Sequence, residues 1–115
     1  MRIIIAGGRD YKQTHDDWVK IIGILRDSQC TEVVSGACSG ADKFGERLAV
    51  ALDLPIHEFP ARWNEYGGKA GPMRNSEMAM NADACILMPG GAGTADMRRK
   101  AIACGLKILY DAGQS

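Results

Sequence analysis

Glycine-rich segments that carry a few polar side chains are the parts of this sequence that could hold a ligand. Glycine lets a backbone approach a ligand closely, and helix N-termini offer unpaired N–H groups to anions. Arginine binds a phosphate through two parallel hydrogen bonds. The residues that we expect to bind the ligand are Gly7, Gly8, Arg9, Asp10, Ser35, Gly36, Gly40, Asp42, Arg74, Asn75, Pro89, Gly90, Gly91, Gly93 and Thr94. Their types and grouping predict a site for an anion, most simply a phosphate.

Two of these segments can be compared with known phosphate loops. Residues 36–42 lack the Gly-Lys-Ser/Thr ending of a P-loop, so the sequence does not support an ATPase mechanism. Asp96 stands where the dinucleotide fingerprint has its last glycine, and its segment follows the fourth predicted strand rather than the first. The sequence therefore argues against an ordinary NAD dehydrogenase.

Several of the polar residues also have a purely structural explanation. Thr94 could act as the N-cap of the last helix in addition to binding a phosphate. Asp42 could complement the dipole of the second helix, or it could accept hydrogen bonds from a ribose. Arg9 could pair with Asp10 at the surface instead of contacting a ligand. These alternatives remain open at the level of the sequence.

Residues 62–69 form the longest irregular stretch that the sequence predicts, and they carry Trp63 and Tyr66. Such a stretch could fold over a ligand and stack on a base. Trp63 could equally fill the core.

Five short apolar runs rich in β-branched residues recur at intervals too long for hairpins. They predict strands at residues 2–6, 31–35, 55–59, 84–88 and 107–110.

Helical patterns separate these strands, and they begin at or just after Thr14, Ala41, Pro72 and Thr94. Asp17 follows Thr14 by three residues, as in a capping box. The second helix is expected to run to Leu52, with Ala51 on its buried face. Gly105 is expected to cap the end of the last helix.

This alternation predicts a single Rossmann-like three-layer α/β domain over residues 1–115. A mostly parallel five-stranded sheet carries helices on both faces, because right-handed crossovers are nearly obligatory. We expect the strand order 3-2-1-4-5. Most of the glycines fall in the connections that leave the strands, so the ligand site is expected at the carboxyl ends of the strands.

Charge and cysteine usage narrow the classes of partner. Fourteen basic residues balance fourteen acidic ones, so nothing favours nonspecific binding to nucleic acid or to an anionic membrane. No apolar run approaches the roughly 20 residues of a membrane span, and no signal-peptide pattern is present, so we expect a cytoplasmic protein. The cysteines form no CxxC pair, and three of the four lie among apolar or small residues, which indicates reduced, packed thiols. No metal site and no cofactor are predicted.

The last glycine segment matches a known nucleotide-binding motif. Pro89-Gly90-Gly91-Ala92-Gly93-Thr94 resembles the PGGxGT signature of the SLOG superfamily, which includes the Lonely Guy phosphoribohydrolases and DprA-like proteins. Residues 7–11, 35–42 and 70–75 further resemble its YspA-like branch, found in bacteria and their phages. The resemblance spans nearly the whole chain. It implies a Rossmann-like fold, a nucleotide-derived ligand at the glycine-rich rim and a homodimer.

The catalytic residues of the Lonely Guy enzymes are matched only in part. Residues 74–78 are similar to their RKxxM segment, so the resemblance implies a catalytic role for Arg74. The glutamate that ends their PGGxGTxxE motif is replaced here by Met97, which can neither stabilise an oxocarbenium ion nor activate water. Glu77 or Asp96 would have to supply the missing carboxylate.

Three functions follow from the sequence. The leading hypothesis is a sensor or sequestering protein that binds a nucleoside monophosphate, ADP-ribose or an NAD derivative. The second is an enzyme of the phosphoribohydrolase type that cleaves the N-glycosidic bond of a nucleotide. The third is a DprA-like module for single-stranded DNA. Zero net charge and few aromatic residues argue against the third, so a nucleic-acid partner is not expected.

Overall fold

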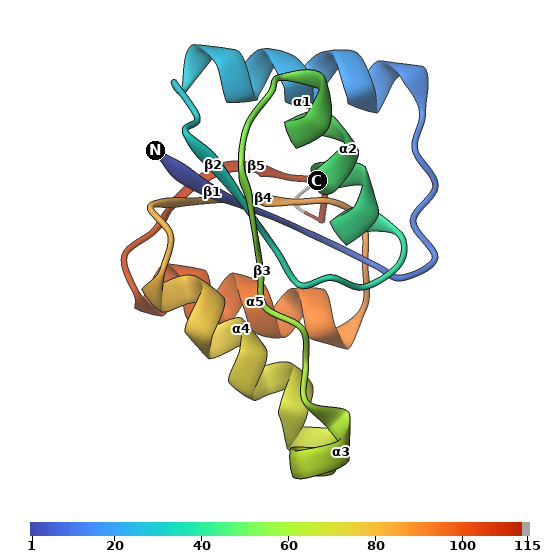
Figure 1. Cartoon of the computed structure of the whole chain (residues 1–115), viewed down its shortest axis with the longest axis vertical. Helices are drawn as coiled ribbons and strands as arrows, with labels where there is room; N and C mark the ends of the chain where they lie inside the picture. Colours follow the sequence, from blue (N-terminus) through green and yellow to red (C-terminus); the bar gives the residue numbers. More distant parts are fainter. Residues whose placement is uncertain (114–115) are drawn as a thin grey trace.

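Strands and helices alternate along the chain in the computed structural model, which describes residues 1–113 (Figure 1). The elements are β1 (Arg2–Ala6), α1 (His15–Asp27), β2 (Glu32–Ser35), α2 (Ala41–Ala51), β3 (Ile56–Glu58), α3 (Trp63–Tyr66), a short 3₁₀ helix η1 (Gly67–Lys69), α4 (Ala70–Met80), β4 (Ala84–Leu87), α5 (Ala92–Ala103) and β5 (Lys107–Asp111). The last two residues of the predicted domain, Gln114 and Ser115, lie outside the described residues.

The five strands form one parallel sheet in the order β3-β2-β1-β4-β5, which confirms both the predicted fold class and the predicted strand order. The central strand is β1, where Ile3 pairs with Val33 of β2 on one side and with Ala84 of β4 on the other. All carboxyl ends of the strands therefore lie at the same edge of the sheet.

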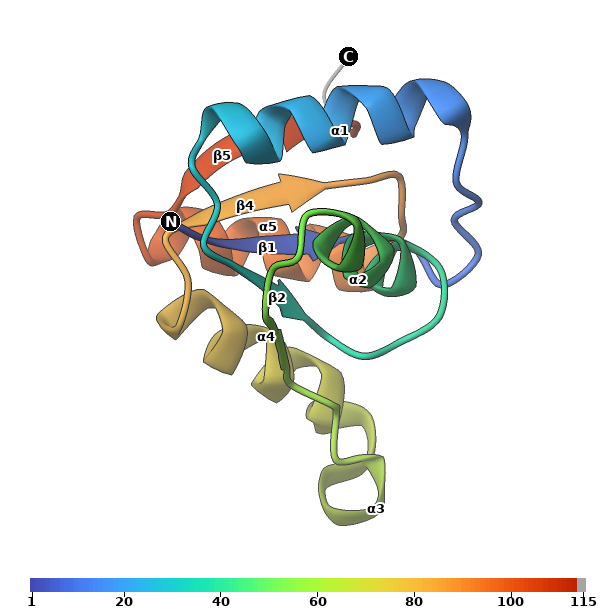
Figure 2. The same cartoon turned by 45° about the horizontal axis from the view of Figure 1, so that its top comes forward.

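The side chains of β1 alternate between two buried layers. Ile3 and Ile5 belong to the cluster that α1 and α2 cover, whereas Ile4 and Ala6 belong to the cluster that α4 and α5 cover. Figures 1 and 2 show these two helix pairs on opposite faces of the sheet. Because both faces are buried, β1 is apolar along almost its whole length, as expected for the central strand of a three-layer α/β domain.

The start of α1 forms half of the predicted capping box. Thr14 is the N-cap, and its hydroxyl accepts the backbone N–H of Asp17 at 3.1 Å. The Asp17 carboxylate does not return to Thr14 but accepts the Tyr11 hydroxyl at 2.5 Å. Burial and this carboxylate raise the pKa of Tyr11. The side chain of Asp17 thus ties the loop after β1 to α1.

Three predicted helix boundaries are wrong by a few residues. Helix α2 ends one residue early, and Ala51 is exposed rather than buried. Helix α4 begins two residues before Pro72, which sits in the first turn, where its missing N–H has no intrahelical partner to lose. Helix α5 begins before Thr94, and its N-cap is Gly91, so the predicted N-cap role of Thr94 is wrong.

Residues 63–69 are helical rather than irregular, because α3 is followed directly by η1, whose first residue Gly67 has φ +56°. Trp63 is 45% exposed, so it does not plug the core.

The end of α5 confirms the role predicted for Gly105. Gly105 has φ +75°, its N–H donates to Ile102 O, and the next N–H, of Leu106, donates to Ala101 O. This is a Schellman motif, in which glycine occupies the left-handed position. Arg98 of α5 then forms a two-pronged ion pair with Asp111 of β5, at 2.6 and 2.7 Å.

The cysteines are all free thiols but differ in burial. Cys85 is buried, Cys30 and Cys38 are partly buried, and Cys104 is exposed, so the prediction of packed thiols fails for Cys104.

None of the helices in residues 1–113 has the length and apolar character that a bilayer crossing requires. The same residues contain no group of three or more His, Cys, Asp or Glu side chains that could hold a metal ion.

Candidate functional site

A cavity of about 1010 Å³ lies at the carboxyl ends of the strands. It is lined by the end of β1, by the segments after β1, β2 and β4, by Trp63 of α3 and by residues of α4 and α5. The predicted ligand-binding residues among its lining are Gly7, Gly8, Arg9, Asp10, Gly36, Asp42, Arg74, Asn75, Pro89, Gly90, Gly91, Gly93 and Thr94. The structure therefore brings most of the predicted site together.

Three predicted site residues lie outside the lining. The Ser35 hydroxyl donates to the Glu46 carboxylate at 2.6 Å and accepts the N–H of Ala37 at 3.1 Å. Gly40 has φ +74°, and a Cβ there would lie 2.2 Å from Gly8 O. Both residues shape the loop between β2 and α2 rather than the cavity wall.

Glu77 is the third of these residues. The cavity side of α4 is a stripe of Gly71, Arg74, Asn75 and Met78, with the helical spacing i, i+3, i+4 and i+7. Glu77 lies off this stripe and is exposed. The structure therefore does not bring the predicted catalytic residue Glu77 into the cavity.

Gly8 joins the N-terminal ends of two helices. Its carbonyl oxygen accepts the N–H of Ala41, the first residue of α2, at 3.1 Å. Its own N–H donates to Pro89 O, just before α5, at 2.8 Å. A Cβ on Gly90 would lie only 2.7 Å from Gly8 N and 2.0 Å from the Thr94 hydroxyl. Glycine at position 90 is thus required by this close approach.

The start of α5 is open towards the cavity. No acidic residue lies in its first turn, and its first N–H groups have no intrahelical acceptor. A Cβ on Gly93 would meet nothing within 4 Å, so packing inside the protein does not require a glycine there. Thr94 is 6% exposed, and within residues 1–113 its hydroxyl forms no hydrogen bond. This end of the cavity offers several donors that are unused.

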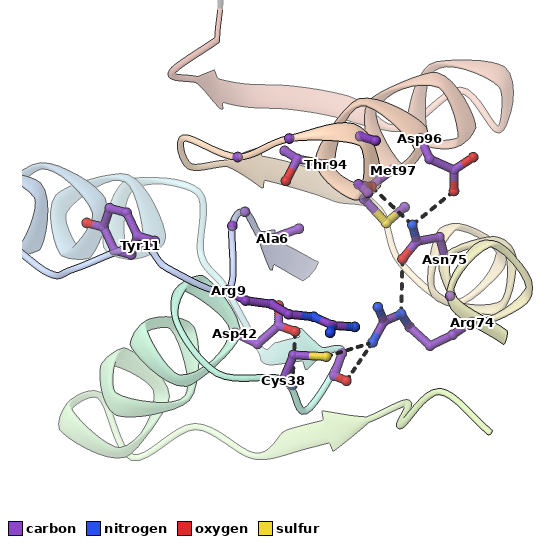
Figure 3. Close-up of a pocket in the computed structure, with 18 of the residues that line it drawn as sticks. Ala6, Arg9, Tyr11, Cys38, Asp42, Arg74, Asn75, Thr94, Asp96 and Met97 are labelled. Carbon is purple, nitrogen blue, oxygen red and sulfur yellow. Dashed lines mark hydrogen bonds between the residues drawn. The ribbon is translucent and has the colours of Figure 1, made fainter. Parts of the chain in front are cut away.

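Arg9 and Arg74 point toward one another across the cavity (Figure 3). Arg74 is anchored, since Nη1 donates to Gly36 O at 2.6 Å and Nε donates to Asn75 Oδ1 at 3.0 Å. Arg9 Cζ lies 5.4 Å from the centroid of the Trp63 ring. In the described part of the chain neither guanidinium forms an ion pair, so the surface pair of Arg9 with Asp10 is not formed.

Asp96 lines the cavity with a carboxylate that is already engaged. It accepts hydrogen bonds from Lys100 Nζ at 2.8 Å and from Asn75 Nδ2 at 3.0 Å. Burial favours its neutral form, but the bonds from Lys100 and Asn75 outweigh burial and lower the pKa of Asp96. The group is therefore a fixed anion that holds α4 against α5.

Asp42 behaves differently, although it also lines the cavity. It is 7% exposed, and its Oδ2 accepts the backbone N–H of Cys38 at 3.1 Å. Burial raises the pKa of Asp42, against the opposing effects of the Cys38 N–H and the charge of Arg74. Among residues 1–113 its Oδ1 has no hydrogen-bond partner, and it is not sealed from solvent. This oxygen is free to accept a donor from a ligand.

Some lining residues were missing from the predicted site. They are Ala6, Tyr11, Cys38, Trp63, Gly71, Pro72, Met78, Ala92, Met97 and Arg99. Helical spacing from Arg74 could have indicated Gly71 and Met78, and Cys38 lies inside a glycine segment. Met97 is 1% exposed and lines the cavity, so the position of the missing glutamate belongs to the site.

The fold and the cavity define a Rossmann-like α/β protein with a cavity at the carboxyl ends of a parallel sheet, where open α/β sheets commonly bind their ligands. No protein-family model matches the chain. The chain is 31% identical over 117 aligned positions to the Gene 61 protein of Mycobacterium phage D29, and the match covers 94% of each protein. The chain therefore belongs to the same family as this phage protein. The comparison assigns a family, and the function has to be argued from the site.

Proposed function

We propose that the protein binds a nucleotide-derived small molecule and holds its phosphate between Arg9, Arg74 and the start of α5. The observation that carries this proposal is the pair of guanidinium groups that face each other without an ion pair. Two like charges at close range repel each other, and an anion between them turns the repulsion into attraction. Guanidinium groups also match the geometry of phosphate oxygens.

The start of α5 supports the same assignment. Its first N–H groups and the Thr94 hydroxyl are unused donors, and no carboxylate in the first turn competes for them. An anion at a helix N-terminus is favoured by both the free N–H groups and the helix dipole. The open space beside Gly93 leaves room for a phosphate to approach the backbone.

The Asp42 carboxylate is evidence that the ligand carries a sugar next to that phosphate. A buried carboxylate oxygen without a partner repels an anion but accepts hydrogen bonds from hydroxyl groups. The volume of about 1010 Å³ suits a mononucleotide or a larger compound such as ADP-ribose. Phosphate donors at α5 and a hydroxyl acceptor at α2 together favour a ribose phosphate.

The test is an incubation with nucleoside monophosphates, NAD, ADP-ribose and cyclic nucleotides, followed by mass spectrometry of retained ligand and released base. We expect one of these compounds to be retained intact. Thr94→Val should weaken its binding roughly tenfold, because the phosphate loses a hydrogen bond. Thr31→Val is the matched control, since the Thr31 hydroxyl contacts Met1 outside the cavity lining.

Two results would overturn the proposal. The first is that no compound in the panel is retained at millimolar concentration by folded protein. The second is that Thr94→Val and Thr31→Val bind the retained compound equally well.

Cleavage of the N-glycosidic bond is a second candidate function, and it is favoured by one observation. The Asp42 carboxyl has a raised pKa and an unpartnered oxygen in the cavity, which suits proton donation to a leaving base. Base accumulating over many turnovers in the same incubation would support this function. Asp42→Asn should then abolish turnover, whereas Glu77→Gln, at an exposed position outside the lining, should not affect it.

Membership of the SLOG superfamily and assembly as a homodimer are further parts of our proposal. Residues 89–94 span the turn before α5 and the first residues of α5 at the carboxyl edge of the sheet, where a PGGxGT motif would act on a ligand. Met73 and Met80 are exposed on α4 at 39% and 68%, which suits an intersubunit contact. Light scattering after size exclusion tests the dimer, and a concentration-independent monomer mass would contradict it.

A further inference from the structure

Trp63 is a large aromatic side chain that is exposed although it lines the cavity. It begins α3, which stands apart from the sheet beyond the start of α4 (Figures 1 and 2). The indole remains 45% exposed. Burial in the core therefore does not explain a tryptophan at this position.

Helix α4 supports the edge of the indole. A Cβ on Gly71 would lie 3.2 Å from Trp63 Cη2, which shows that the ring edge lies against the backbone of α4 at this glycine. Gly71 is itself one of the residues that line the cavity. The ring is thus held by its edge, and its faces are left for other contacts.

The Arg9 guanidinium lies over the ring of Trp63. Its Cζ is 5.4 Å from the ring centroid, and among residues 1–113 this guanidinium forms no hydrogen bond or ion pair. A planar group stacked between the two would need about 7 Å, which is two van der Waals contacts. Arg9 therefore occupies the space that a planar ligand group would take on this ring face.

We propose that Trp63 is the platform for the base of the ligand, and that Arg9 leaves this ring face when it turns to the bound phosphate. The proposal rests on the proposed function, because it uses the same cavity and the same phosphate. Every base has a face that stacks on an aromatic ring, and stacking on an indole is stronger than an exposed cation–π contact. The ligand is thus a phosphate compound that carries a planar heterocycle, rather than a simple sugar phosphate.

Calorimetric titrations with the common nucleoside 5′-monophosphates and with ribose 5-phosphate test this inference. We expect at least one nucleotide to bind about tenfold or more tightly than ribose 5-phosphate. Trp63→Leu should reduce the ratio of the two affinities, nucleotide over ribose 5-phosphate, to near one. Tyr66→Leu is the matched control, because Tyr66 is an exposed aromatic of the same helix that does not line the cavity, and the ratio should survive.

Fluorescence gives a second measurement that does not depend on a Trp63 variant. The sequence has two tryptophans, and Trp18 packs on Phe44 in the α1–α2 layer, away from the cavity lining. In Trp18→Phe protein all tryptophan emission comes from Trp63. Saturation with the preferred nucleotide should quench this emission strongly.

The outcomes separate the two proposals. If nucleotides and ribose 5-phosphate both fail to bind, the proposed function falls, and this inference falls with it. If they bind equally well, or if Trp63→Leu keeps the ratio, the phosphate site stands and the role of Trp63 is wrong. Saturation of Trp18→Phe protein without quenching would likewise overturn the role of Trp63.

Discussion

The backbone N–H of Cys38 donates a 3.1 Å hydrogen bond to Oδ2 of Asp42, and this bond closes the loop between β2 and α2. The same loop presents Gly36 O to Arg74 at 2.6 Å. One oxygen of the Asp42 carboxylate therefore holds the loop that anchors Arg74. The other oxygen is left for the cavity.

Asp42→Asn should change how stability depends on pH. Burial raises the pKa of Asp42, so the folded protein binds this proton more tightly than the unfolded chain does. The stabilisation from that proton is present at low pH and is lost as the pH rises through the folded-state pKa. Asparagine has no charge to bury and can still accept the Cys38 N–H. The melting temperature of Asp42→Asn relative to the parent should therefore be higher at about pH 7 than at about pH 4.

Asp96→Asn provides a control with the opposite sign. The pKa of Asp96 is lowered, so its ionised form stabilises the fold above the unfolded-state pKa and this contribution is lost as the pH falls. Asp96→Asn should lose more stability at neutral than at acidic pH. The same pH trend in both variants would contradict the opposite pKa shifts of Asp42 and Asp96 in the folded protein.

Gly90→Ala and Gly93→Ala form a pair that separates packing from ligand binding. A Cβ at position 90 would clash with the backbone of Gly8, which should cost about 2 kcal/mol or more in unfolding free energy. A Cβ at position 93 meets no atom of the protein, so stability should be unchanged or slightly raised, since alanine favours helix. Gly93→Ala should nevertheless weaken ligand binding by occupying the space next to α5. Denaturant unfolding and calorimetry measure the two effects, and full affinity in Gly93→Ala would contradict the placement of the phosphate.

Arg98→Gln should destabilise the fold by about 2 kcal/mol, because it removes the two-pronged ion pair with the Asp111 carboxylate, whose side chain is 8% exposed. Glu65→Gln breaks the ion pair between Glu65, which is 58% exposed, and Arg62, which is 68% exposed. It should change the free energy of unfolding by less than about 0.5 kcal/mol. Urea denaturation compares the unfolding free energies of the two variants. Equal losses would show that burial does not set the strength of these pairs.

Thiol labelling of the native protein should follow burial and ligand occupancy. Cys104 is exposed and should react first, whereas burial raises the pKa of Cys85 to about 12 and should keep it unreactive. Cys38 lines the cavity, so the ligand retained in the binding assay should slow its labelling and leave Cys104 unaffected. Peptide mass spectrometry resolves the sites. Unchanged labelling of Cys38 at saturation would argue against a ligand in this cavity.

The sheet could be predicted because the apolar runs alternate with helical patterns, and this alternation leaves few parallel topologies. The cavity could be predicted because its glycines follow the strands. The sequence could not exclude Glu77 as a residue of the site. Which carboxylate faces the cavity depends on which side of α4 does, and that side carries Arg74 and Met78. The contact of Arg9 with Trp63 joins distant segments and leaves no pattern in the sequence.

The hydrogen bonds of Gly8 to Ala41 and Pro89 make the cavity depend on parts of the chain that are far apart in the sequence. They join the loop after β1 to the start of α2 and to the segment before α5, so three distant stretches must be in place together. A nascent chain that stops short of β4 has the first two stretches but lacks the segment before α5 that lines the cavity. Occupancy of the cavity would thus report that the chain has been made as far as α5 and that these three stretches have assembled.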